Sequence, residues 1–246
     1  ETSITLNTGE TTVLKKVVRP GDATDKRVSW KSSNTKIVTV DAKGNVKAVA
    51  KGTATITATT KDGSRLSASC TVTVKQPVTK LTLNKTSLTL MRNKTFALTV
   101  TASPSNANNK AVTWKSSNTK AATVDSKGNV KAVAKGTASI TATAKDGSGV
   151  KAVCKVTGTQ PVTKITLNKT SLTLNRGKTF TLKATAGPAS ANNKAVKWTT
   201  SNKAVATVTS KGVVKAVKKG TATITATAKD GSGKKAVCKI TVKQLV

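Results

Sequence analysis

The stretch TWKSSNTKAATVDSKGNVKAVAKGTASITATAKDGS, residues 113–148, contains most of the information about how this chain folds. Its opening phrase recurs, because WKSSNTK stands at both 30–36 and 114–120 and WTTSNKA stands at 198–204. Four kinds of residue repeat at a spacing of 84: Trp30, Trp114 and Trp198; Cys70, Cys154 and Cys238; Gly52, Gly136 and Gly220; Asp62, Asp146 and Asp230. This unbroken spacing predicts three tandem copies of one structural unit.

A proline-containing joint separates one copy from the next. KQPV at 75–78 and TQPV at 159–162 lie between runs of strand-like composition, and a proline cannot donate a hydrogen bond to a sheet. We therefore expect three domains, at residues 1–76, 77–160 and 161–246.

Within one copy the dominant period is two. Apolar and polar residues alternate in TFALTVTA (95–102), TASITATA (137–144) and KAVCKVT (151–157), a pattern typical of half-buried antiparallel strands. Turn sequences separate these runs, namely DSKGNV (125–130), with a glycine suited to positive φ, and KDGS (145–148). Six or seven short strands per copy and no helical stretch predict an all-β fold of small β-sandwiches.

The tryptophans and cysteines are predicted to form the structural core. Trp114 shares one face of AVTWKSS with Val112 and Ser116, as expected for the large anchor of a central strand. Cys154 alternates in phase with apolar neighbours, which favours a small buried hydrophobe over a redox thiol or an intermolecular bridge. The predicted core residues are Trp30, Trp114, Trp198, Cys70, Cys154 and Cys238.

These motifs resemble bacterial immunoglobulin-like domains of group 2, which are found in intimin- and invasin-type adhesins and in secreted bacterial proteins. The matching residues are LTLNKTSLTL (81–90), the 113–148 stretch and CKVT (154–157), with parallel text in the other two copies. The resemblance implies three tandem immunoglobulin-like β-sandwich domains in an elongated rod. It also implies an extracellular spacer or adhesion module with no active site of its own.

The first copy departs from this pattern at its start. Copies two and three open with PVTKLTLN (77–84) and PVTKITLN (161–168), whereas Glu1 aligns with Lys85, so the first copy is expected to lack its first strand. Lys16 also stands where Val100 points inward. Two explanations are open. Either the sequence is a portion of a longer protein that was trimmed one strand too late, or the first domain receives its missing strand from another chain. The C-terminal KQLV ends too soon after its own strand to be donated.

Catalysis is not expected from this sequence. The chain contains no histidine, and the third copy contains a single carboxylate, Asp230, in a glycine turn. Paired-carboxylate hydrolysis, a Ser-His-Asp triad and a calcium cage all require side chains that these copies do not supply. We therefore predict no enzyme activity, no cofactor and no metal site.

Positive charge is the distinctive chemical feature. The chain carries 43 Lys and Arg against 9 Asp and Glu, and the third copy holds 17 basic residues against one acidic residue. The lysines predicted to bind polyanions, with modest selectivity, are Lys197, Lys215, Lys218, Lys219, Lys234, Lys235 and Lys239. The alternative is that they only keep edge strands soluble. Since the aromatic residues are assigned to the core and no recognition helix is predicted, we expect anionic cell-wall or host glycans and no specific nucleic acid.

The resulting prediction is a non-catalytic structural or adhesion stalk of a bacterial surface or secreted protein. Two alternatives remain: a fibre subunit that assembles by strand donation between neighbouring copies, and a carbohydrate-binding module of a larger enzyme, which would need an exposed aromatic residue. The resemblance implies an extracellular location, with a virion surface as a further option. No apolar run is long enough to cross a membrane, and the first residues of this stretch do not resemble a signal peptide.

Overall fold

The computed structural model describes residues 2–244, so the two ends considered above, Glu1 and the pair Leu245 and Val246, lie outside it. Every regular element in this range is a strand. The chain divides into two compact units. One contains the residues up to Thr86 together with 98–115 and 141–153, and the other contains 87–97, 116–140 and the chain from Cys154 onward. The division therefore falls within the middle copy.

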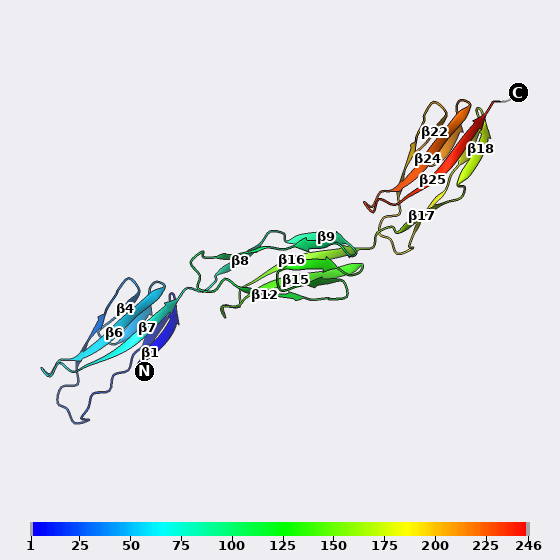
Figure 1. Ribbon diagram of the computed structural model, residues 1–246. Helices are drawn as coiled ribbons and strands as arrows, with labels where there is room; N and C mark the ends of the chain where they lie inside the picture. Colours follow the sequence, from blue (N-terminus) through cyan, green and yellow to red (C-terminus); the bar gives the residue numbers. More distant parts are fainter. Residues whose placement is uncertain (1, 245–246) are drawn as a thin grey trace. The chain divides into compact units, whose positions relative to one another are not determined.

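The first copy, in the first unit, folds as two sheets packed face to face (Figure 1). Its strands are β1 (Ser3–Asn7), β2 (Thr11–Val13), β3 (Val28–Ser32), β4 (Val38–Val40), β5 (Asn45–Ala48), β6 (Gly52–Thr60) and β7 (Ser67–Lys75). One sheet has the order β1-β7-β6-β3 and the other β2-β5-β4. Alternation directs Val38 and Val46 from one sheet, and Ile56 and Val72 from the other, into a common core.

The strand β1 and its equivalents in the other copies pair in a direction that the alternation did not indicate. β1 lies parallel to β7, β9 (Ser87–Met91) parallel to β16 (Lys151–Thr159), and β18 (Ser171–Asn175) parallel to β25 (Lys235–Lys243). The antiparallel pairing predicted from alternation does not extend to these three pairs. Their partner is the last strand of the same copy, so the whole copy forms the long connection that a parallel pair requires.

The run TFALTVTA, predicted as a single strand, is two strands in two different sheets. β10 (Thr95–Ala97) pairs with β14 (Asn129–Ala132), whereas β11 (Val100–Ser103) pairs with β8 (Lys80–Leu83). The third copy divides in the same way, into β19 (Thr179–Thr181) and β20 (Ala184–Gly187). The alternation continues through this corner, which is why the period-two pattern does not reveal that the chain changes sheets.

The third copy, in the second unit, has nine strands rather than the six or seven predicted. Its further strands are β17 (Lys164–Leu167), β21 (Val196–Thr200), β22 (Ala206–Val208), β23 (Val213–Ala216) and β24 (Gly220–Ala228). The sheets have the orders β18-β25-β24-β21, β19-β23-β22 and β17-β20. The middle copy follows the same strand sequence, with β12 (Val112–Ser116), β13 (Ala122–Val124) and β15 (Gly136–Ala144) as its remaining strands.

Two core clusters hold the third copy together. The larger lies between the main sheets and includes Leu182, Ile224, Cys238 and Ile240. The smaller surrounds the opening segment of the copy, where Val162 and Ile165 pack on inward residues of the neighbouring strands. Within residues 2–244, the first copy shows a counterpart of the larger cluster alone.

Candidate functional site

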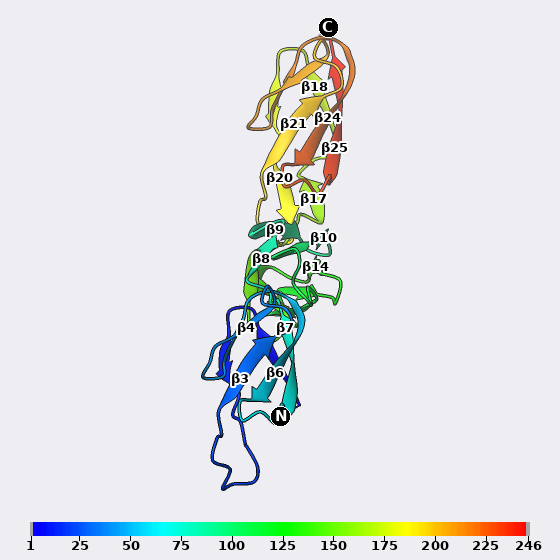
Figure 2. The ribbon, with the colours of Figure 1, turned by 90° about the vertical axis from the view of Figure 1, so that its left-hand side faces the viewer.

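All seven lysines predicted to bind polyanions are exposed. Three of them share the outer face of one sheet, whose strands β21, β24 and β25 lie side by side in Figure 2. Lys197 of β21 lies opposite Thr227 of β24, which lies opposite Lys235 of β25. Lys239 stands further along β25, opposite Thr223. Across two strands, Lys197 and Lys235 are roughly 10 Å apart at their Cα atoms.

The other four lysines do not join this face. Lys215 projects outward from β23, in the opposite sheet of the sandwich. Lys218 and Lys219 occupy the loop before β24, and Lys234 the turn after it, so they flank opposite ends of that strand. The seven lysines predicted to bind polyanions are therefore divided between two faces and two loops. Sequence proximity suggested one cluster, but adjacent segments of a sandwich lie in different sheets.

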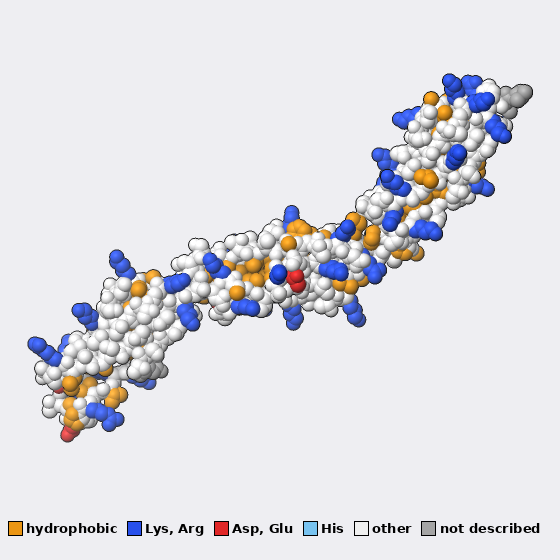
Figure 3. Space-filling model, viewed as in Figure 1, with side chains coloured by type: hydrophobic (Ala, Val, Ile, Leu, Met, Phe, Trp, Pro, Cys, Tyr) orange, Lys and Arg blue, Asp and Glu red, His pale blue; other side chains and the backbone are white. Residues whose placement is uncertain are grey.

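These lysines form no ion pair within residues 2–244. Among residues 2–244 the one ion pair joins Arg27 to Asp25 in the first copy, at 2.9 Å. Hydrogen bonds from Arg27 are the main cause that lowers the pKa of Asp25 to about 2. Basic side chains are distributed over the surface seen in Figure 3, with few acidic ones among them. The surface potential of the third copy is thus uncompensated by its own carboxylates.

The predicted core residues occupy the interior to different extents. Each tryptophan is half-buried and, in the first and third copies, packs against the main cluster. The turn glycine restricts this packing: a Cβ on Gly212, at φ +82°, would lie 3.0 Å from Trp198 Cζ2 and would also collide with the Leu182 carbonyl oxygen. The sequence indicated the positive φ but not this close approach to the indole.

The three cysteines are buried thiols and form no disulfide with one another. Cys154 and Cys238 are fully inaccessible, and burial raises the pKa of both thiols. Cys70 retains 5% exposure. The core around Cys70 is therefore slightly less closed than the cores around Cys154 and Cys238.

In the second and third copies, an aspartate in the turn before the last strand bonds to the backbone at the start of the same copy. Asp230 accepts hydrogen bonds from its own turn residue Ser232 and from the backbone N–H of Val162. Asp146 makes the same contacts with Ser148 and Val78. Burial alone would raise the pKa of Asp230, but these hydrogen bonds outweigh it and lower the pKa below the usual value.

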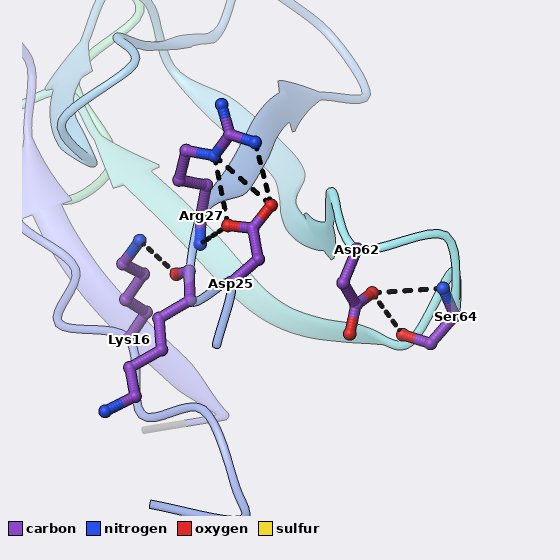
Figure 4. Close-up of polar contacts among 6 residues, drawn as sticks. Lys16, Asp25, Arg27, Asp62 and Ser64 are labelled. Carbon is purple, nitrogen blue, oxygen red and sulfur yellow. Dashed lines mark hydrogen bonds and ion pairs between the residues drawn. The ribbon is translucent and has the colours of Figure 1, made fainter. Parts of the chain in front are cut away.

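The first copy instead contains an open groove of about 720 Å³. One wall is the segment 12–19, and the other walls are inward residues of β3, β6 and β7, including Trp30, Ala58 and Ala68. Lys16, which stands where Val100 points inward in the second copy, is exposed at the groove, and its amine donates a 2.7 Å hydrogen bond to the Lys26 carbonyl (Figure 4). The alignment of Glu1 with Lys85 was the sequence feature that indicated an incomplete first copy. The residues that line the groove were not predicted.

No group of three or more potential metal-ligating side chains occurs in the part of the chain that the structure covers. Likewise, none of residues 2–244 forms a helix with the length and apolarity of a membrane span.

Comparison with known proteins gives matches to repeats of this kind. The model of the bacterial Ig-like domain (group 2) family matches residues 1–72, 77–156 and 161–239. A segment of 74 residues is 51% identical to lacto-N-biosidase of Bifidobacterium bifidum and covers 30% of this chain but 6% of that protein. The Ig-like virion protein of Serratia phage KSP90 is 36% identical over 170 residues, which cover 68% of this chain and 66% of that protein.

One solved structure with a similar arrangement of strands is mouse Cadherin-23 EC22-24. It covers 99% of this chain and 96% of its own length, with 12% sequence identity and a TM-score of 0.39.

Proposed function

Since the chain belongs to the bacterial Ig-like domain (group 2) family, we propose that it is a non-catalytic structural module of a bacterial surface or secreted protein. Its repeats space and attach the domains around them. In this proposal the exposed lysines of the third copy give it non-specific affinity for anionic polymers of the cell wall or of host glycans.

The observation that carries the proposal is the unbalanced charge of the third copy. Seventeen basic residues accompany Asp230 as the single acidic residue in 161–246, and Lys197, Lys235 and Lys239 share one exposed sheet face. A flexible polyanion can contact several of these lysines at once, and each such contact releases counterions and adds to the affinity. Such a face favours repeated negative charge over any particular sugar.

The same surface argues against selective recognition. Specific binding of sugar rings or single-stranded nucleic acid generally uses exposed aromatic platforms. Here each tryptophan is half-buried, and Trp30 and Trp198 pack against the cores of their copies. Attachment should therefore be electrostatic and weakened by salt.

The test is binding of the whole chain to purified wall teichoic acid, measured by sedimentation velocity, with neutral dextran as the reference polymer. We expect binding to teichoic acid alone, with an apparent affinity that falls at least tenfold between about 50 and 200 mM NaCl. Binding that does not change with salt, or equal binding to dextran, contradicts the proposal.

Charge-matched variants locate the binding face. The triple variant Lys197→Thr, Lys235→Thr, Lys239→Thr should lose most of the affinity at low salt. The control Lys36→Thr, Lys43→Thr, Lys47→Thr removes the same charge from exposed positions of the first copy and should lose less. An equal loss in the two variants would exclude a preferred face on the third copy.

A second candidate is an accessory module of a larger enzyme. The similarity of one segment to 6% of lacto-N-biosidase supports it, because the repeat there is a small part of the protein. In the same way, the virion protein supports a location on a phage particle. Both settings retain the structural role and change what the repeats are attached to.

A further inference from the structure

We propose that one end of the third copy is a binding site for short chains of directly linked phosphates. The site, called the end cluster below, consists of exposed basic residues at the end of the sandwich where β18 and β25 finish. Its members are Arg176, Lys178, Lys215, Lys218, Lys219 and Lys243. The end cluster is separate from the face formed by Lys197, Lys235 and Lys239, and it goes beyond the non-specific attachment proposed above.

The four-stranded sheet β18-β25-β24-β21 supplies the first half of the end cluster. Arg176 follows β18, and its backbone N–H donates a 3.0 Å hydrogen bond to the carbonyl of Lys243, the last residue of β25. Gly220, the first residue of β24, pairs with Val242. Lys219 comes directly before this pair and Lys243 directly after it, so the register places the two lysines opposite each other.

The other sheet, β19-β23-β22, supplies the second half. Lys215 of β23 lies opposite Thr179 of β19. The Ala216 N–H donates a 3.0 Å hydrogen bond to the Lys178 carbonyl. β23 ends at Ala216, and Lys218 lies on the loop that leads from there into β24. This loop crosses from one sheet to the other, so it brings its two lysines between the two halves.

Two short connections fix the halves beside each other. The turn 176–178 joins β18 to β19, and the Gly177 N–H donates a 2.9 Å hydrogen bond to the Ala216 carbonyl. The loop 217–219 joins β23 to β24. Since packed sheets lie about 10 Å apart, one short polymer can reach all six basic residues. On the face seen in Figure 3, Lys and Arg side chains gather at this end of the third copy.

The charge of the end cluster is not balanced by an acidic side chain. Asp230, the single acidic residue in 161–246, lies in the turn between β24 and β25, at the opposite end of both strands. Within residues 2–244, the one ion pair lies in the first copy, and no side chain of the end cluster donates a hydrogen bond. The six cationic groups are therefore available to an external anion.

The first copy shows that the fold does not require these charges. The residues at the same repeat positions are Thr8, Glu10, Lys47, Ala50, Lys51 and Lys75. The corresponding backbone contacts still form, because the Thr8 N–H donates to the Lys75 carbonyl and the Ala48 N–H to the Glu10 carbonyl. Solubility does not explain the third copy either, since it is served by interspersed charges of both signs.

This end of a copy is exposed even where the chain continues. Lys47, Lys51 and Lys75 are exposed in the first copy, although the second copy follows directly. The availability of the end cluster therefore does not depend on the position of the last residue.

The chemistry of the end cluster favours linked phosphates over a charged sugar polymer. Sugar rings are generally held by aromatic platforms, whereas Phe180 and Trp198, the aromatic residues of the third copy, pack on its core. Lysine acts as a compact point charge. In polyphosphate a single oxygen joins neighbouring charged phosphorus atoms, whereas a polyol separates the phosphates of teichoic acid. The denser anion is the better match for six cations at one end of a domain.

The test is binding of short-chain polyphosphate to the whole chain, measured by isothermal titration calorimetry at low salt. The variant Lys215→Thr, Lys218→Thr, Lys219→Thr should bind at least about tenfold more weakly, because it loses half of the contacts. The control is the triple threonine variant of the sheet face described above, which removes the same charge from the same copy. It should lose less than about threefold. All the substituted lysines are exposed, so both variants keep the core intact.

Acetylation of lysines, followed by mass spectrometry, locates the bound polyphosphate on the unmodified chain. Lys178, Lys218 and Lys219 should react several-fold more slowly with saturating polyphosphate than without it. Lys36 and Lys43, which are exposed in the first copy, are internal controls and should react at an unchanged rate.

Three results would overturn the proposal. The first is the absence of binding, and the second is an equal loss in the two variants, because net charge and not the end cluster would then hold the ligand. The third is equal affinity for heparin or teichoic acid at the same concentration of charged groups, which would exclude a preference for linked phosphates. Binding of teichoic acid to the sheet face is measured with other variants, so the two proposals fail separately.

Discussion

The first and third copies carry the same tryptophan, cysteine and turn positions, yet their interiors are closed to different extents. In the third copy Leu182 and Cys238 are at most 1% exposed, and Val162 closes a second cluster beside them. In the first copy the counterpart Leu14 is half-buried, and both Leu14 and Cys70 line a groove. The β1-β7-β6-β3 and β18-β25-β24-β21 sheets nevertheless have equivalent strand orders.

The difference shows that the four-stranded sheet forms its strand pairs without the opening strand, whereas the interior requires that strand. The hydrogen bonds of β6 and β7 are complete in the first copy. What the opening strand adds is apolar area, and a fully buried valine, leucine or isoleucine contributes roughly 1.5–3 kcal/mol. Three predictions test this comparison.

The largest effect is expected when the third copy is made to resemble the first. The double variant Val162→Asn, Ile165→Asn should remove at least about 3 kcal/mol from the free energy of unfolding of the third copy, because it loses two buried side chains. The amides of residues 183–187 should then exchange as rapidly as those of 15–19, measured by hydrogen exchange of the whole chain. The control Val217→Asn, Val237→Asn alters exposed valines and should change little; equal losses would contradict the comparison.

A smaller contrast is expected for the paired leucines. Leu182→Ala should lower the free energy of unfolding of its copy by about 2–5 kcal/mol, since it creates a cavity in a closed core. Leu14→Ala should cost less than half as much, because its side chain already borders the groove. Urea titration with hydrogen exchange resolves the two copies, and similar losses would mean that the first copy is closed in solution.

The smallest effect concerns the aspartate turns and depends on pH. The lowered pKa of Asp230 means that its stabilising contribution is present above the ordinary pKa of 3.8 and is lost as the pH falls through the lower pKa of the folded state. Asp230→Asn should cost about 1 kcal/mol at pH 6 and progressively less as the pH is lowered below the ordinary pKa of the carboxyl group. Asp62→Asn should have a smaller effect, because Asp62 lacks the strand amide. Urea unfolding at both pH values measures the difference.

Much of the fold was predictable from period and spacing. The repeat of 84 residues, the turn glycines with positive φ and the inward position of Cys154 follow from local pattern, and the structure agrees with each. The parallel pairing of β1 with β7 and the change of sheet between β10 and β11 were not predicted. Alternation reports which side of a strand is buried, and it carries no information about which strand lies beside it.

The candidate sites divide in a similar way. The sequence established the excess of lysine, but it grouped seven lysines that the sandwich separates onto two faces and two loops.

The sequence by itself therefore determined the family, the all-β character, the three copies and the sign of the surface charge, because these depend on residue type and local period. The tertiary structure alone decided which lysines share a face and which residues line the groove of the first copy. Both depend on contacts between residues distant in sequence. Such contacts are fixed when two sheets bury a common set of side chains, and no single segment encodes that choice.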